Sequence, residues 1–379
     1  MSDKNAVFLY SEQLENYSYP PSCPFKIERA PELRKTLASM GLLAGSGRQE
    51  VATEPATRDM LEMLHTPRYL DALRASENGG WDIDALHMGI GGPDTPVFKG
   101  MYDVGALACG ATLKGADVLL AEEADIAFNP AGGMHHAFPE LAAGFCYIND
   151  VAIVCKYLAE KKQRVLYLDI DVHHGDGVQN TFYDRNDVMT ISTHESGKYL
   201  FPGTGFEHEV GEGIGFGYSV NFPFPPGTYN EAFMKAFHEI VAPLIQAFDG
   251  DIIVFELGAD GLSGDPLAHL ILTNDVYRQV IEFLLAQNKP LLMTGGGGYS
   301  VENTIRAWSL AWSVISGGHH DMEAMNLGLG GVMLESTDWA GGFVDRELSV
   351  TNEQRRVIEP EIDRIIQSIQ ENVFPIHGL

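Results

Sequence analysis

The chain has 379 residues, of which 45% are hydrophobic and 20% charged, a composition typical of globular proteins that excludes collagen-like and disordered chains. With 25 Lys and Arg against 52 Asp and Glu, the formal net charge is −27. A surface this acidic repels phosphate backbones, so we expect no direct binding of nucleic acid, whereas cationic or Lys-rich partners would be attracted.

Short apolar runs without a polar–apolar alternation recur along the chain, as expected for strands buried on both faces. These predicted strands are Ala6–Tyr10, Asp125–Asn129, Arg164–Asp169, Val188–Ser192, Tyr218–Phe222, Asp251–Leu257 and Pro290–Thr294. Segments with helical periodicity lie at about Glu28–Leu43, Met101–Glu122, Asn149–Lys161, Tyr229–Phe248, Thr273–Gln287, Val301–Ser316 and Asn352–Asn372. This alternation predicts one three-layer α/β domain over residues 1–379, with a mostly parallel sheet and helices on both faces.

The chain shows no sign of a disulfide framework or of a membrane segment. It has four cysteines at no metal-ligand spacing, Cys23, Cys109, Cys146 and Cys155. Residues 2–5 are polar, and no stretch reaches the ~18 consecutive apolar residues of a membrane span. We therefore expect a cytoplasmic protein without a signal peptide or a membrane anchor.

Glycines and polar side chains follow four of the predicted strands. Residues 130–136 read PAGGMHH, residues 169–177 read DIDVHHGDG, residues 258–261 read GADG and residues 295–299 read GGGGY. In a parallel α/β sheet, ligands bind beyond the carboxyl ends of the strands. These four segments therefore predict an active site at that edge of the sheet.

The segment 169–177 has the residue types and spacing of a metal site. Asp171 and His173 are two residues apart, so in an extended chain their side chains project to the same side. A carboxylate and an imidazole suit Zn²⁺ or a similar divalent ion, and Asp260 is the natural third ligand. The alternative, an Asp-capped loop with a solvated histidine, leaves three Asp and two His within eight residues unexplained.

Two further histidines, His135 and His136, are adjacent and so are poorly placed to bind one ion together. Each could act as an acid or a base beside a metal-bound water, held in its tautomer by a carboxylate. Asp169 and Asp176 are the carboxylates left after the metal ligands are assigned, so the sequence allows two His–Asp pairs. A pair of loop histidines bonded to the backbone is the alternative.

Tyr299 follows four glycines, where a phenol could donate to a developing oxyanion, although packing over the turn explains the residue equally well. The glycine-rich segments lack the G-x-G-x-x-G and P-loop patterns, and no G-x-S-x-G elbow occurs. Nucleotide-dependent oxidoreductases and serine hydrolases are therefore disfavoured. Cys146 lies between Phe145 and Tyr147, which favours a packed thiol over a nucleophile.

These segments, together with GFCYIND at residues 144–150, resemble the zinc-dependent histone deacetylase family, most closely its class I branch and the bacterial deacetylase and acetoin-utilisation relatives. The stretches HTPRYL (65–70), PGTG (202–205) and LSGD (262–265) fit as well, so that the resemblance extends from about His65 to Trp308. It implies the arginase/deacetylase fold, a single catalytic domain and removal of acetyl or other acyl groups from lysine side chains of proteins or peptides.

The resemblance also implies a role for each site residue. The zinc ligands would be Asp171, His173 and Asp260, and a structural potassium ion would lie near Asp169, Ser192 and Thr193. The catalytic residues would be His135 with Asp169, His136 with Asp176, and Tyr299 as the oxyanion donor. The substrate would be bound by Asp94, Gly144, Phe145, Phe201 and Leu267.

The sequence departs from the family pattern in four places. Lys26 stands about where class I members have an arginine below the active site. The loop 194–200, just before Phe201, is about one residue longer than in the family, so the match of Phe201 to the family's tunnel phenylalanine depends on how this loop is aligned. Thr193 replaces an aromatic residue. Leu267 lies where polyamine-specific relatives have an acid, which favours acyl-lysine over acetylated polyamines.

Three other functions fit parts of the sequence. An acetylpolyamine amidohydrolase would share the mechanism and differ at the substrate gate. An arginase-like hydrolase with two manganese ions would need a carboxylate two residues after His173, where Gly175 stands. A catalytically silent protein that binds acyl-lysine or a metabolite would not need Tyr299 or both His–Asp pairs.

The last part of the chain, after about Gly317, contains no motif that we can interpret chemically. We interpret His319 and His320 as a solvated loop pair rather than as metal ligands. The oligomeric state, the preferred acyl chain and the physiological substrate do not follow from local motifs.

Overall fold

The computed structural model describes residues 4–317 and 343–379. Eight parallel strands form one sheet in the order β2-β1-β3-β8-β7-β4-β5-β6. They are β1 (Ala6–Tyr10), β2 (Arg48–Ala52), β3 (Ile126–Asn129), β4 (Val165–Asp169), β5 (Val188–Glu195), β6 (Ser219–Phe224), β7 (Ile252–Glu256) and β8 (Leu291–Thr294). The order places β4, β7 and β8 in the middle of the sheet.

The helices before β4 are α1 (Arg29–Ser39), α2 (Arg58–Leu61), α3 (Pro67–Ala75), α4 (Ile83–His87), α5 (Met101–Leu120) and α6 (Asp150–Glu160). Those after it are α7 (Asp176–Phe182), α8 (Asn230–Ala236), α9 (Ala242–Phe248), α10 (Asn274–Ala286), α11 (Val301–Ile315) and α13 (Asn352–Asn372). Short 3₁₀ or π turns occur at Glu12–Asn16, Ser76–Gly80, Gly213–Gly215, Phe237–Val241 and Phe374–His377. No helix within these described ranges is both long and apolar enough to cross a bilayer.

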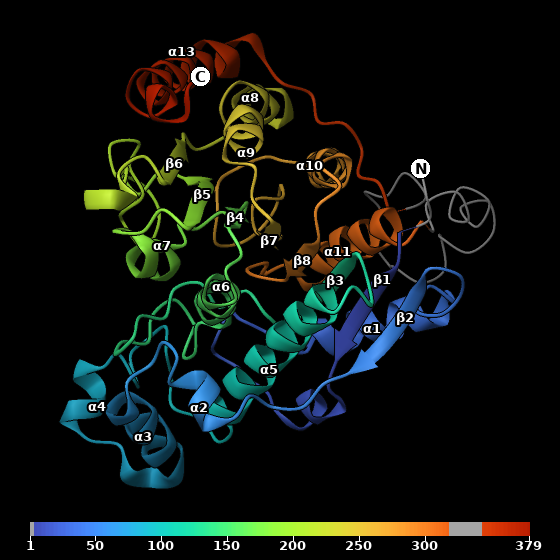
Figure 1. Ribbon diagram of the computed structural model, residues 1–379, viewed down its shortest axis with the longest axis vertical. Helices are drawn as coiled ribbons and strands as arrows, with labels where there is room; N and C mark the ends of the chain where they lie inside the picture. The colour runs from blue at the N-terminus through green and yellow to red at the C-terminus, as the bar shows by residue number, and fades with distance from the viewer. Residues whose placement is uncertain (1–3, 318–342) are drawn as a thin grey trace.

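Helices cover both faces of the sheet. Successive residues of a strand point to opposite faces, so neighbouring residues of one strand contact different helices. The ring of Phe8 contacts that of Trp312 on α11, with centroids 5.4 Å apart. The next residue, Leu9, faces α5, where a Cβ added to Gly115 would come within 2.8 Å of its side chain. Figure 1 shows the strands between α5 and α6 on one side and α9, α10 and α11 on the other. This confirms the predicted α/β architecture.

All seven predicted strands and all seven predicted helices are present, with ends shifted by up to four residues. The predicted helix Tyr229–Phe248 consists of α8 and α9 joined by a π turn. The edge strand β2 was not predicted, because its sequence RQEVA is polar and exposed or only half-buried along its length. The short helices α2, α3, α4 and α7 were also missed, since fewer than three turns show little periodicity.

A row of polar side chains crosses the carboxyl edge of the sheet. Strand register pairs Ser192 with Asp169, Asp169 with Glu256, Glu256 with Thr294, and Thr294 with Asn129. All five residues are buried. Since charged groups are the most costly to bury without a role or a partner, the two carboxyl groups of this row, Asp169 and Glu256, mark the part of the core where function is to be sought.

Candidate active site

The three residues predicted as metal ligands come together at the ends of β4 and β7. One ligand atom from each of Asp171, His173 and Asp260 lies within 4.8 Å of the other two, and all three residues are buried. The Nδ1 atom of His173 is 3.2 Å from Oδ1 of Asp171 and 3.0 Å from Oδ2 of Asp260. The three donor atoms therefore converge on one point.

The electrostatics of this triad fit a divalent cation. Burial and the neighbouring Asp171 carboxylate raise the pKa of Asp260 to about 7. Although burial opposes protonation, hydrogen bonds to the two carboxylates raise the pKa of His173 to about 10. Two carboxylates forced together away from water favour a positive partner between them, and a mixed oxygen–nitrogen set of three ligands is the pattern of a zinc site with an open position.

Glycines make room for the carboxylates of the triad. A Cβ added at Gly258 would lie 2.0 Å from Oδ2 of Asp171, and one added at Gly297 would lie 1.8 Å from Oδ2 of Asp260. The Gly297 amide also donates to Oδ2 of Asp171 over 2.5 Å. The glycines after β7 and β8 thus let the backbone approach the triad, which a side chain would prevent.

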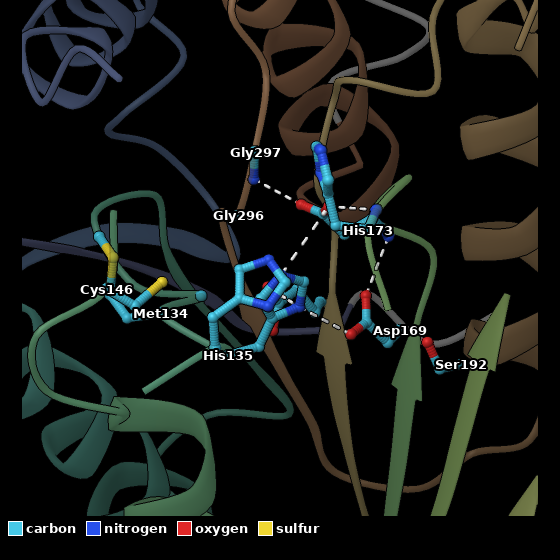
Figure 2. A network of polar contacts seen from close by, with 12 residues as sticks. Met134, His135, Cys146, Asp169, His173, Ser192, Gly296 and Gly297 are labelled. Atoms are coloured by element: carbon cyan, nitrogen blue, oxygen red, sulfur yellow. Dashed lines mark hydrogen bonds and ion pairs between the residues drawn. The ribbon is translucent and has the colours of Figure 1, made fainter. Parts of the chain in front are cut away.

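The two predicted His–Asp pairs are both formed. Nδ1 of His135 is 2.9 Å from Oδ2 of Asp169, and Nδ1 of His136 is 2.7 Å from Oδ1 of Asp176. The Nε2 atoms of the two histidines are 3.0 Å apart. Figure 2 shows His135 directed at Asp169, with His173 close by.

The two histidines differ in their electrostatic surroundings. Although burial opposes protonation, the carboxylates of Glu256 and Asp169 raise the pKa of His135 well above its usual range. Burial and the neighbouring His135 lower the pKa of His136 to about 4. At neutral pH the first ring is therefore charged, whereas the second is neutral and can accept a proton.

The loop that carries the two histidines is held by residues to which the sequence analysis assigned no role. The buried carboxylate of Asp150 accepts hydrogen bonds from the amides of Gly133 and Met134. The side chain of Asn149 donates to the carbonyl of His135 over 3.1 Å. Both residues belong to the GFCYIND stretch that the sequence analysis singled out. The motif alone does not reveal which loop these two side chains bind.

Tyr299 lies beside the triad, and its backbone is held by Asp265. The ring centroid of Tyr299 is 6.1 Å from that of His173 and 5.7 Å from that of Phe145. Oδ2 of Asp265 accepts the Tyr299 amide over 2.8 Å, and Oδ1 accepts the Leu267 amide over 2.9 Å. Burial and the nearby carboxylates of Asp260 and Asp171 raise the pKa of Tyr299 well above its usual range, so its hydroxyl remains a donor.

Two of the predicted substrate residues, Phe201 and Gly144, lie against His136, and Asp94 and Phe145 adjoin Gly144. The Phe201 ring, 44% exposed, is 5.0 Å from the His136 ring. A Cβ added at Gly144 would come within 2.3 Å of His136, and the Gly144 amide donates to Oδ2 of Asp94 over 2.8 Å. Phe145 has a φ of 66°, a strained value for a bulky residue, and such strain is concentrated at functional sites. The fifth residue, Leu267, is half-buried and shares with Tyr299 a backbone hydrogen bond to the carboxylate of Asp265.

The residues predicted to lie near a potassium ion are gathered behind Asp171. Oδ1 of Asp169 accepts the Asp171 amide over 2.9 Å, and the Thr193 hydroxyl donates to the Asp169 carbonyl over 3.2 Å. Ser192 is the register neighbour of Asp169, and its Oγ lies 2.8 Å from Nδ1 of His194. The three residues predicted for the potassium site therefore lie next to one another beside the triad.

The interpretation of Lys26 was wrong. Its ammonium group donates to the loop carbonyls of Pro21 and Cys23, away from the triad. The buried basic residue behind the site is Arg29, which donates to the carbonyls of Gly296 and Gly298 over 2.9 and 2.7 Å. At the start of a helix, Arg29 resembles any surface cation, and only the packing of α1 on α11 reveals its position.

Comparison with known proteins gives a consistent picture. The family model for the histone deacetylase domain matches residues 23–315. The acetoin utilization protein AcuC of Bacillus subtilis is 37% identical over 325 residues, which cover 83% of each chain. Human histone deacetylase 1 is 35% identical over 314 residues, which are 82% of this chain and 64% of the human one.

Solved structures agree with these sequence comparisons. A crystal structure of an HDAC homologue from Aquifex aeolicus superposes with a TM-score of 0.81 at 30% identity, covering 96% of this chain and 100% of that one. An HDAC homologue in complex with SAHA superposes with a TM-score of 0.83, with the same identity and coverage. The likeness therefore extends over nearly the whole fold.

His319 and His320, which the sequence analysis interpreted as a solvated loop pair, lie outside the described residues.

Proposed function

Because this chain belongs to the histone deacetylase family, whose members are hydrolytic deacetylases, we propose that it is a zinc-dependent amidohydrolase that removes acetyl or other acyl groups from lysine side chains of proteins or peptides. The observation that carries the proposal is the convergence of the Asp171–His173–Asp260 triad and the neutral His136 in one buried site. Bound zinc would polarise the acyl carbonyl and make an attacking water more acidic.

The residues around the triad supply the remaining chemistry. His136, oriented by Asp176, takes the proton of the attacking water and later returns it to the leaving lysine amine. The charged ring of His135 gives electrostatic support. The Tyr299 hydroxyl donates to the oxyanion that develops on the acyl carbonyl. The products are a free lysine and a carboxylate, usually acetate.

The remaining expectations belong to the same proposal. We place a structural potassium ion near Asp169, Ser192 and Thr193, which is supported by the oxygen atoms gathered there. We treat residues 1–379 as one catalytic domain because a single sheet carries the site. A reducing, cytoplasmic location is supported by the four cysteines, all of which are free and buried.

The arginase-like alternative is disfavoured by the geometry at Gly175. A Cβ added there would lie 2.5 Å from Oδ2 of Asp169, so a carboxylate side chain has no room at that position. The silent-binder alternative leaves the two His–Asp pairs without a purpose. Neither alternative has an observation in its favour.

Metal-resolved turnover tests the function directly. We expect metal-free protein to be inactive and Zn²⁺ to restore cleavage of an acetyl-lysine peptide, measured by release of acetate. Tyr299→Phe should retain zinc and lose about 10²–10³ in kcat, because one oxyanion donor is removed. An inactive protein with one zinc bound, tested with acetyl-lysine and longer acyl-lysine peptides, would contradict the proposal. So would full activity in Tyr299→Phe.

Substrate choice is tested at Leu267. Leu267→Glu places a carboxylate at the half-buried rim, where it would attract the free ammonium groups of acetylated spermidine. A pair of this kind is worth up to about 1 kcal/mol, so we expect kcat/KM for acetylspermidine to rise about fivefold relative to an acetyl-lysine peptide. The neutral Leu267→Gln variant is the matched control and should leave this ratio unchanged. Preference of the wild-type protein for the polyamine would overturn the assignment of acyl-lysine.

A further inference from the structure

A carboxyl group that raises the pKa of His135, but to which the proposed function gives no separate role, lies against the His135–Asp169 pair. Glu256, the last residue of β7, is completely buried and is the register neighbour of Asp169 on β4. Its Oε1 atom is 3.1 Å from Nδ1 of His135, whereas Oδ2 of Asp169 is 2.9 Å from the same nitrogen. One imidazole N–H is thus enclosed by two carboxylates from neighbouring strands.

A tyrosine hydroxyl joins the carboxyl groups of Asp169 and Glu256. Tyr167 lies two residues before Asp169 on β4, so both side chains project from the same face of the sheet. Its hydroxyl is 2.6 Å from Oδ2 of Asp169 and 2.8 Å from Oε2 of Glu256. The four side chains form a closed cluster in which Glu256 contacts both the histidine and the tyrosine that supports its aspartate.

The energetics argue against a role in folding alone. A buried carboxylate costs several kcal/mol in desolvation, and a neutral or apolar residue of similar volume often serves stability better. Oε1 has no partner among the described residues that meets hydrogen-bond geometry, and His135 is the group that faces it. A group retained at such a cost, and aimed at a catalytic side chain, is best explained by what it does to that side chain.

We propose that Glu256 is a positioning residue, which together with Asp169 holds the Nδ1–H edge of His135 and thereby directs its Nε2 atom at His136 and the reaction centre. This role rests on the proposed function. Asp169 alone fixes one direction for the imidazole N–H, whereas two carboxylates on either side restrict rotation of the ring. Figure 2 shows the arrangement of the histidine: His135 faces Asp169, and Ser192 lies on the far side of that aspartate.

The test is Glu256→Gln, which keeps the shape and can still bond to Tyr167 but replaces the carboxyl group that faces His135 by an amide. We expect kcat for the acetyl-lysine peptide to fall about tenfold with KM unchanged, a loss of about 1.4 kcal/mol at the transition state. Zinc content and melting temperature should not fall. The matched control is Thr294→Val on the neighbouring strand, in the same polar row, whose hydroxyl has no hydrogen-bond partner among the described residues. It should behave as wild type.

A second measurement does not depend on turnover. In zinc-loaded protein labelled at histidine, the Nδ1–H resonance of His135, identified by its loss in His135→Ala, should move upfield in Glu256→Gln and stay in place in Thr294→Val. An unmoved resonance with unchanged kcat would overturn the proposal. So would a loss of kcat accompanied by lost zinc or a lower melting temperature and no shift in the resonance. A zinc-loaded wild-type protein without turnover would instead contradict the proposed function, and the resonance would still decide the role of Glu256.

Discussion

Replacing Asp260 by Asn is expected to remove stoichiometric zinc binding and to reduce deacetylation by about 10³-fold or more. The charge stabilisation that a catalytic metal supplies is worth several kcal/mol, and each 1.36 kcal/mol is tenfold in rate. An amide oxygen is a poor substitute for the carboxylate that faces Nδ1 of His173. Metal content by elemental analysis and acetate release from an acetyl-lysine peptide measure the two effects.

In the metal-free protein, we expect the same substitution to leave the free energy of unfolding unchanged or to increase it. Burial and Asp171 raise the pKa of Asp260 to about 7 from a usual value of 3.8. A carboxyl whose pKa is higher in the folded than in the unfolded chain destabilises the fold as the pH rises between these two values. Metal-free Asp260→Asn should therefore be at least as stable as the wild type at pH 7, whereas only the wild type should gain stability from added zinc. Urea unfolding with and without zinc measures both differences.

Asp59→Asn, at an exposed acid outside the site, is the control for loss of one negative charge. It should retain zinc and turnover. An Asp260→Asn protein that binds one zinc ion and turns over peptide at the wild-type rate would rule out the assigned triad.

Replacing His136 by Ala is expected to lower kcat by about 10²–10⁴ while zinc content stays at one per chain, because the role proposed for this residue is to transfer protons and not to bind the metal. Burial and His135 lower the pKa of His136 to about 4, so the ring is neutral and able to accept a proton above about pH 5. In the wild type, kcat should therefore fall only as the pH decreases toward that value. In the variant, kcat should show no such fall at acid pH. Steady-state kinetics between about pH 4.5 and 8, which covers the approach to that pKa, measure both the lower kcat of the variant and its pH dependence.

The matched control for His136 is His208→Ala, which removes an exposed imidazole that stacks on Phe206 outside the site. Its rate and pH profile should equal those of the wild type. Loss of zinc from His136→Ala would show that the general base has been assigned to the wrong residue. So would a fall of kcat at acid pH in this variant that equals that of the wild type.

Local sequence was sufficient where the physical cause is local. The strand Ala6–Tyr10 was predicted with its observed bounds because it is apolar throughout and buried on both faces. The helix Asn352–Asn372 also has the predicted bounds, and it begins at a capping box formed by Thr351 and Gln354. The spacing of Asp171 and His173 belongs to the same class, since two residues of extended chain suffice to direct both side chains to one side.

The residues that support the site could not be found in this way, because each acts on a partner far along the chain. Glu256 meets His135 only because β7 pairs with β4 in one register, and a shift by one residue would turn its side chain to the other face. Arg29 reaches the carbonyls of Gly296 and Gly298 only because α1 packs on α11. The sequence by itself determined the architecture and the Asp171–His173 motif, which depend on periodicity and short spacing. Only the tertiary structure decided which buried charges surround that motif, because the partner of a buried polar group is selected by packing and strand register.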